Sequence, residues 1–155
     1  LTVVSLMMIL VFRSVKIGLL SMVPNLSPVL LVIGGMGCWG LPLDYYRLLI
    51  APVAIGIAVD DTIHLMTRYH REFLKSRDYE KALYDTMQGV GRALLITSVI
   101  LVLGFLVNLF SVMDGQKSFG TLLAGVIAAA LLADFLLMPA LILSLKPWGG
   151  PAAPR

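Results

Sequence analysis

The sequence predicts an all-α membrane protein, built as a polytopic bundle of helices. Hydrophobic residues make up 59% of the 155 residues and charged residues only 14%, whereas about 25% of the residues of an ordinary soluble domain are charged. The mean hydropathy is +0.93. Long apolar stretches, most of them near the roughly 20 residues that a membrane helix needs, alternate with short polar turns. These observations exclude an ordinary soluble domain, and the net charge of +3 does not indicate nucleic-acid binding.

We expect five membrane helices in a transmembrane bundle of residues 1–145, followed by a cytoplasmic tail at 146–155. The membrane helices are predicted at residues 1–12, 17–38, 48–67, 93–112 and 119–145, with a surface helix at about 79–90. The first of these is only about 18 Å long, whereas the hydrocarbon core is about 30 Å thick. We therefore expect this helix to begin upstream, and the chain to be the C-terminal fragment of a larger protein.

Local signals refine two of these helices. Two prolines in the second helix, with Asn25 and Ser27 between them, are expected to kink it and to turn both polar side chains into the bundle. A functional kink and a plain packing kink both fit this pattern. Asp78 is predicted to cap the amphipathic surface helix, which Gly89 or Gly91 is expected to end.

The third helix carries two adjacent acids and a histidine, Asp60, Asp61 and His64, inside an otherwise apolar segment. An aspartate at the bilayer centre costs roughly 2.5 to 3.5 kcal/mol on insertion scales, so we expect a function that uses the charge of the pair. Helical spacing places Gly56, Asp60, His64 and Thr67 on one face. The imidazole is within reach of either acid.

These two acids are predicted to bind protons. Apolar surroundings disfavour the charged form of a carboxyl group, and a like-charged neighbour disfavours it further. The pair is therefore expected to titrate as a coupled unit that holds one proton near neutral pH. The alternative is that fixed cations neutralise both acids, which would then only lock helices together.

Three further polar side chains are candidates for a proton relay. Thr97 and Ser98 are expected either to lie opposite Asp60 and Asp61 as relay partners, or only to form interhelical hydrogen bonds worth about 0.6 kcal/mol each. Asp134 in the last helix either joins the acid cluster or only holds a helix contact by hydrogen bonding, and we favour the second interpretation.

Small residues at helical spacing predict close contacts between helices. Those expected to pack are Gly56, Gly104, Asn108, Gly120 and Ala124. Between the fourth and last helices, residues 113–117 are predicted to form a short turn.

The basic residues sort strongly by membrane side. Ten fall on one side, namely Arg13, Lys16, Arg68, Arg71, Lys75, Arg77, Lys81, Arg92, Lys146 and Arg155, and two on the other, Arg47 and Lys117. Since basic loops stay on the cytoplasmic side, we expect the protein in the inner (cytoplasmic) membrane with a cytoplasmic C-terminus.

The sequence indicates no cofactor and no metal site. A single cysteine, Cys38, excludes an internal disulfide and a cysteine metal cluster. The Asp-Asp-x-x-His motif is a weak candidate for a divalent cation, because Mg²⁺ needs more oxygen ligands and the other nearby acid, Glu72, lies at the interface. A protease dyad would need acids from two helices. We therefore do not expect an enzyme, and a membrane-embedded metal-dependent enzyme remains only a minor alternative.

Residues 56–65, followed by Arg68 and Tyr69, resemble the fourth or tenth transmembrane helix of the resistance-nodulation-division (RND) superfamily. The resemblance is closest to its lipid and hydrophobe exporters, which are related to the mycobacterial membrane protein large (MMPL) family and to sterol-sensing domains. The residues that extend the resemblance are 12–14, 24–25, 89–93, 97–98, 104–105, Asp134 and 138–141.

The resemblance implies a twelve-helix transporter made of two six-helix halves, of which this chain would be helices eight to twelve. It also implies secondary transport driven by the proton-motive force. Protons that bind Asp60 and Asp61, with Thr97 as a relay, would drive the export of lipids or other hydrophobic molecules. Drug-efflux members carry a lysine in the tenth helix where this chain has acids, which favours the lipid-exporter branch.

The resemblance also implies the partners. These are protons, a hydrophobic or lipid-like substrate, membrane lipids and the missing N-terminal half of the same protein, with a homo-oligomer as a further option. The alternative function is a sterol-sensing or scaffold membrane module that performs no transport of its own.

Overall fold

The computed structural model describes residues 2–12, 14–38, 40 and 44–145. The predicted tail at 146–155 lies outside these residues, as do Arg13 and Trp39. The helices are α1 (Thr2–Phe12), α2 (Val15–Cys38), α3 (Tyr45–Leu48), α4 (Ile50–Ser76), α5 (Tyr79–Thr86), α6 (Arg92–Leu106) and α7 (Asp114–Leu145). A π-helical turn, Met87–Gly91, joins α5 to α6, and a 3₁₀ turn, Val107–Phe110, extends α6.

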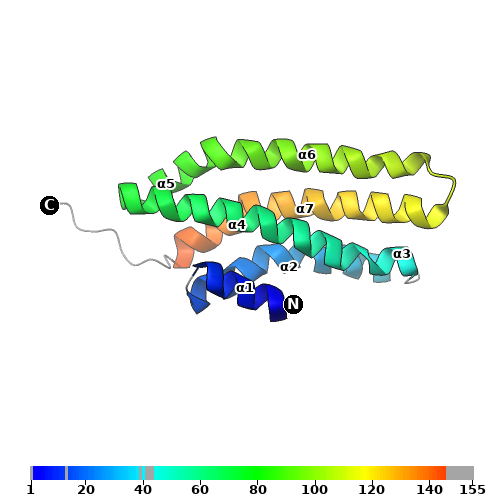
Figure 1. Cartoon of the computed structure of the whole chain (residues 1–155), viewed down its shortest axis with the longest axis horizontal. Helices are drawn as coiled ribbons and strands as arrows, with labels where there is room; N and C mark the ends of the chain where they lie inside the picture. The colour runs from blue at the N-terminus through cyan, green and yellow to red at the C-terminus, as the bar shows by residue number, and fades with distance from the viewer. Residues whose placement is uncertain (1, 13, 39, 41–43, 146–155) are drawn as a thin grey trace.

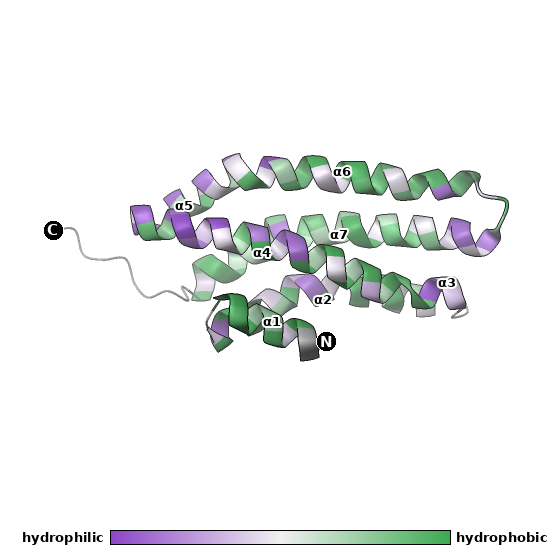
Figure 2. Ribbon diagram, viewed as in Figure 1, coloured by the Kyte–Doolittle hydropathy of each residue, from purple (hydrophilic) through white to green (hydrophobic). Residues whose placement is uncertain are grey.

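The predicted fold class, an all-α membrane bundle, is confirmed. Four helical stretches in the described part of the chain are long and apolar enough to cross a membrane. They run roughly along one common axis, and α7 packs against α2, α4 and α6 (Figure 1). Apolar residues predominate along the middle of the long helices, and polar residues gather towards their ends (Figure 2). This distribution is what a bilayer requires of helices that cross it.

The third helix is longer than expected. It was predicted to end near residue 67, but α4 continues to Ser76 and ends at Arg77 in the left-handed region, with φ of 54°. The extension keeps a buried face, because Tyr69 and Phe73 pack in a core cluster with residues of α5 and α7. Glu72 Oε1 also forms ion pairs with Arg68 Nη2 at 2.8 Å and with Lys75 Nζ at 3.0 Å, on adjacent turns of the same helix.

The connection between α5 and α6 differs from the prediction in one respect. The Asp78 cap is present, since its side chain accepts from the backbone N–H groups of Glu80 at 2.9 Å and Lys81 at 3.4 Å. The predicted stop at Gly89 or Gly91 is wrong, because the chain stays helical through the π-helical turn. Gly91 is buried, and a Cβ atom added there would lie 3.3 Å from Met87 Sδ and 3.6 Å from Phe135 Cζ of α7.

The last helix starts earlier than predicted. We expected residues 113–117 to form a turn, but α7 begins at Asp114. The backbone N–H groups of Gln116 and Lys117 both donate to the Met113 carbonyl at 3.1 Å, which starts the helical hydrogen bonding at once. The turn is accordingly confined to the residues just before Asp114.

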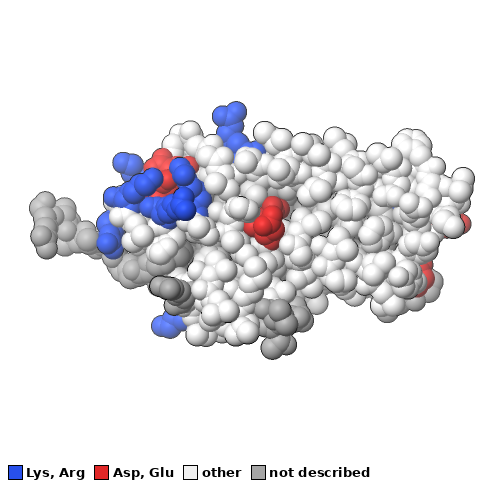
Figure 3. All heavy atoms as spheres, in the orientation of Figure 1, with Lys and Arg blue, Asp and Glu red and all other residues white. Residues whose placement is uncertain are grey.

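The two ends of the bundle differ in charge. The basic residues expected on one side that the structure describes are Lys16, Arg68, Arg71, Lys75, Arg77, Lys81 and Arg92, whereas Arg47 and Lys117 belong to the opposite end. Figure 3 shows Lys and Arg side chains gathered towards the end where α4 and α5 meet. The start of α2 reaches the same end, because Ile17 shares a core cluster with Tyr69 and Phe73.

Close helix contacts form at some of the expected small residues. A Cβ atom added at Gly120 would lie 2.5 Å from both the Phe105 carbonyl oxygen and the Asn108 Cβ. Ala124, one turn further along α7, is 3% exposed. Gly56 and Gly104 differ from the expectation, since within the described chain nothing lies within 4 Å of a Cβ added at either position.

We predict that Gly120→Ala destabilises the bundle by about 1–3 kcal/mol, because the new methyl group would overlap a backbone carbonyl that cannot move away. Gly125→Ala is the matched control on the same helix, since a Cβ there meets nothing within 4 Å. It should be neutral or slightly stabilising, as alanine favours helix more than glycine. Thermal unfolding of the full-length protein in detergent measures both, and equal effects would contradict the close contact.

Candidate functional site

Three consecutive polar residues at the centre of α4, Asp60, Asp61 and Thr62, face different surroundings. Successive helical residues are about 100° apart, so neighbours in sequence face different surroundings. Thr62 is fully buried, Asp61 is half-buried, and the Asp60 side chain is 73% exposed. Along α4 the buried positions include Ala54, Ala58 and Thr62, spaced four residues apart. The stripe of Gly56, Asp60, His64 and Thr67 faces away from this core.

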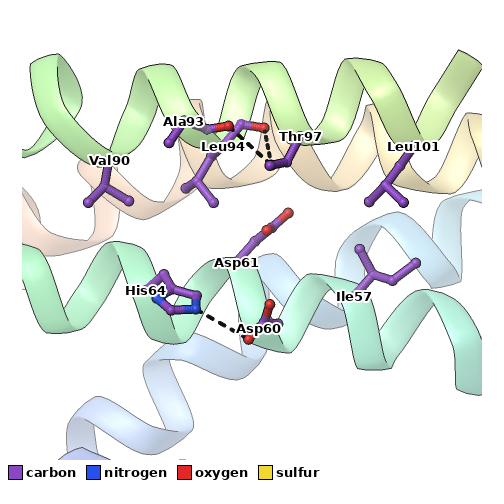
Figure 4. A pocket seen from close by; sticks show the side chains of 9 residues that line it. All are labelled: Ile57, Asp60, Asp61, His64, Val90, Ala93, Leu94, Thr97 and Leu101. Atoms are coloured by element: carbon purple, nitrogen blue, oxygen red, sulfur yellow. Dashed lines mark hydrogen bonds and ion pairs between the residues drawn. The ribbon is translucent and has the colours of Figure 1, made fainter.

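The acids line a cavity between α4 and α6. It has a volume of about 430 Å³. Its lining residues are Ile57, Asp60, Asp61, His64, Val90, Ala93, Leu94, Thr97 and Leu101 (Figure 4). An acidic patch is visible midway between the two ends of the bundle (Figure 3). The cavity therefore combines two carboxyl groups and an imidazole with mostly apolar walls at mid-bundle.

Within this cavity His64 pairs with Asp60. His64 Nε2 lies 3.5 Å from Asp60 Oδ1, one helical turn away, and both side chains are largely exposed. Asp61 points instead towards α6, the helix that carries Thr97 (Figure 4). The two adjacent acids thus share one cavity but have different neighbours.

Thr97 reaches the cavity but does not bond to the acids. Its hydroxyl group lies 3.1 Å from the Ala93 carbonyl and 3.0 Å from the Leu94 carbonyl, and donates within its own helix. A relay through Thr97 would require its hydroxyl to rotate away from these carbonyls or a water molecule to bridge to Asp61.

Ser98 does not face the acid cavity. It is 1% exposed, and its hydroxyl oxygen has no hydrogen-bond partner among the described residues. It lines a separate, almost entirely apolar cavity of about 330 Å³, together with side chains that include Leu131 of α7. The single step from Thr97 to Ser98 turns the side chain from one cavity to the other.

Asp134 also lies apart from the acid cavity. It is 2% exposed, and its Oδ1 atom lies 3.0 Å from the Thr62 hydroxyl oxygen. The same hydroxyl oxygen lies 2.8 Å from Asn25 Oδ1 of α2. Asn25 therefore points into the bundle as the sequence predicted. Ser27 is half-buried and lies 3.4 Å from the Pro24 carbonyl, which Pro28 cannot bond.

Sequence reasoning missed Thr62. It directly follows the two acids, to which a role was assigned from the sequence, whereas none was assigned to Thr62. A usable signal was present, because Ala54, Ala58 and Thr62 repeat every four residues and small residues at that spacing mark a face that packs closely. That face, and not the face of Asp60, is the one that α4 turns towards α2 and α7.

Proton binding is the chemistry that these groups share. Within the part of the chain that the structure describes, no three His, Cys, Asp or Glu side chains come together in a way that could hold a metal ion. A carboxylate beside an imidazole can take up and pass on a proton, and the charges of such groups in a membrane helix mark ion or proton pathways.

A profile of the MMPL family matches residues 1–155, the whole chain. The chain belongs to the MMPL family. It is 30% identical over 135 residues to MJ1562 of Methanocaldococcus jannaschii, and 25% identical over 109 residues to ActII-3 of Streptomyces coelicolor, both of which are named as membrane proteins. These alignments cover 87% and 70% of the MMPL chain, but only 35% and 15% of the two relatives. No solved structure matches the chain.

Family membership indicates a multi-pass membrane protein. The helical bundle of the MMPL chain agrees with this, since its long helices are apolar enough to cross a membrane.

The different directions of Thr97 and Ser98 can be tested by thiol labelling. In a full-length background from which Cys38 and any other cysteine have been removed, we expect Thr97→Cys to react with a water-soluble maleimide and Ser98→Cys to remain unmodified. The reason is that a thiol reacts as the thiolate, which needs contact with water. Faster labelling of Ser98→Cys than of Thr97→Cys would contradict the cavity described above.

Proposed function

We propose that this chain is part of a secondary transporter, driven by the proton-motive force, that exports lipids or other hydrophobic molecules. The observation that carries the proposal is the cavity between α4 and α6, which Asp60, Asp61 and His64 line at mid-bundle. Acids at such depth are costly, roughly 2.5 to 3.5 kcal/mol each on insertion scales, and a costly charge in a membrane helix is by default functional.

The proposed mechanism is a change of charge on α4 that biases two arrangements of the helices. Protonation of Asp60 or Asp61 removes a charge, and with it the preference of that charge for water or for a cationic partner. Uptake of the proton on one side and release on the other then favours each arrangement in turn. Each proton that moves down a potential of 100 mV supplies about 2.3 kcal/mol, before any contribution from a pH gradient.

The exposed stripe of α4 supports a partner outside this chain. Asp60 and His64 have side chains that are 73% and 66% exposed, and charged groups in a membrane helix face a protein interior or water and not lipid. The chain spans 35% of the length of MJ1562. We propose that the rest of the same protein covers this stripe and packs against Gly56 there, and that Gly104, which is exposed on α6, packs against it as well. A second copy of the protein in a homo-oligomer is the alternative cover.

Orientation follows from the charged ends of the bundle. The end that carries most of the described basic residues is proposed to face the cytoplasm, because basic loops remain on that side. We accordingly propose an inner-membrane protein with a cytoplasmic C-terminus and with the turn before Asp114 on the outside.

Substitution of the acids tests this function. Asp60→Asn and Asp61→Asn should each abolish gradient-driven export while the protein is still inserted, because an amide cannot take up the proton. The measurement is efflux of a panel of fluorescent lipid analogues and hydrophobic dyes from cells that express the full-length protein, with and without a protonophore.

Asp114→Asn is the matched control. Asp114 is also an acid of the bundle, but its side chain is 99% exposed at the outer turn. This variant should transport as the wild type does. Full transport by both Asp60→Asn and Asp61→Asn would refute the assignment, and transport that persists under a protonophore would refute proton coupling.

A further inference from the structure

A second buried carboxyl group lies in a hydrogen-bonded chain that joins three helices. Asp134 of α7 contacts Thr62 of α4, with 3.0 Å between Oδ1 and Oγ1, and Thr62 Oγ1 lies 2.8 Å from Asn25 Oδ1 of α2. Asn25 Nδ2 in turn donates to the Ser21 carbonyl at 2.9 Å. Each of these residues is at most 2% exposed. Bulk water cannot supply a missing donor here, so each acceptor in this series of hydrogen bonds needs a hydrogen from one of its own members.

The orientation of the Asn25 amide is determined by Ser21. A backbone carbonyl oxygen only accepts hydrogen bonds, so the amide nitrogen of Asn25 must face it. Exchange of the amide nitrogen and oxygen would place two acceptors 2.9 Å apart. Asn25 consequently presents its oxygen, an acceptor, to the Thr62 hydroxyl group.

The Thr62 hydroxyl group then lies between two oxygens but has only one hydrogen to donate. If it donates to Asn25 and Asp134 is ionised, a carboxylate faces a hydroxyl lone pair at 3.0 Å. If it donates to Asp134, the Asn25 oxygen is left without a donor at 2.8 Å. Either arrangement leaves a buried acceptor unpaired, which is destabilising, and more so when the unpaired group is charged.

We propose that Asp134 is a further proton-binding residue, whose protonated carboxyl group donates to Thr62 and so clasps α7 to α4 and α2. With the proton on Oδ1, Asp134 donates to Thr62 Oγ1, Thr62 donates to Asn25 Oδ1, and Asn25 donates to the Ser21 carbonyl. Every contact then has one hydrogen. Loss of the proton leaves one contact without a hydrogen and opens the clasp.

Among the residues that the structure describes, no cation forms an ion pair with Asp134 and could replace this proton. Within the described chain, Asp61 of α4 is the ionisable group whose charge acts on Asp134. On α2, the groups that take part in these hydrogen bonds are Asn25 and Ser21, and both are neutral. Asp61 is negative when ionised, so its charge works against an ionised Asp134 and links the clasp to the acid cavity on the other face of α4.

Infrared spectroscopy of the full-length protein in lipid tests the clasp. At neutral pH the difference between wild type and Asp134→Asn should contain a carboxylic-acid C=O band and no carboxylate band from this residue. The matched control on the same helix is Asp114→Asn, which should remove a carboxylate band, since that side chain is 99% exposed. A carboxylate band in the Asp134 difference would overturn the proposal.

Two further variants, Thr62→Val and Asp134→Leu, test the clasp independently if Asp134→Asn also changes the structure away from this site. Thr62→Val preserves the shape but removes the hydroxyl acceptor, so the carboxylic-acid band of Asp134 should shift to higher frequency. Asp134→Asn keeps a donor towards Thr62 and should melt near the wild-type temperature, whereas the similarly sized Asp134→Leu should melt clearly lower. An unshifted band in Thr62→Val, or equal melting of the two Asp134 variants, would overturn the clasp.

The clasp rests on packing and hydrogen count, and not on transport. Loss of export in Asp60→Asn with no carboxylic-acid band for Asp134 would support the proposed function and refute the clasp. Full export in Asp60→Asn and Asp61→Asn together with a carboxylic-acid band for Asp134 would refute the proposed function and support the clasp.

Discussion

The structure depends on one constraint, that a polar group in the middle of this bundle must have a partner or reach a cavity. Water that could satisfy an unpaired group is absent from hydrocarbon, and each unsatisfied group there is costly. Helix α4 meets the constraint in two ways. Thr62 turns inward and finds oxygens on α2 and α7, whereas Asp60 and Asp61 turn towards a cavity that α6 completes. Through these contacts α4 meets α2 and α7 on one face and α6 on another.

The contacts of α4 separate acids that look alike in the sequence. Asp60 is open and paired with His64, and Asp61 is half-buried and points to α6. Asp134 is enclosed against Thr62 on the opposite face. Their environments differ in the access of water and in the donors nearby, which are the factors that control protonation. If protons bind at both places, as we propose, α4 alone separates the two sites, and the charge of one acts on the other through that helix.

Most of the fold could be predicted from the sequence because it depends on local features, namely the length of apolar stretches and the residues at helix ends. Apolar length predicted the membrane helices, and the Asp78 cap was readable from one residue type before an amphipathic stretch. The ends of the elements were less accessible. Helix α4 passes beyond residue 67, where Tyr69 and Phe73 pack against other helices, and the chain stays helical through Gly91, which is buried near Phe135 of α7. Such contacts are between residues far apart in the chain.

By itself, the sequence determined that this is a helical membrane protein with acids at mid-bundle, since hydropathy and residue type suffice for both. It also offered Thr97 and Ser98 as candidates to lie opposite those acids, without deciding between this position and ordinary helix packing. Only the tertiary structure decided that Ser98 faces away from them, that Thr62 joins Asn25 to Asp134, and that Gly120 packs where Gly56 does not. The physical reason is rotation: helical spacing states which residues share a face, but neighbouring helices decide what that face meets.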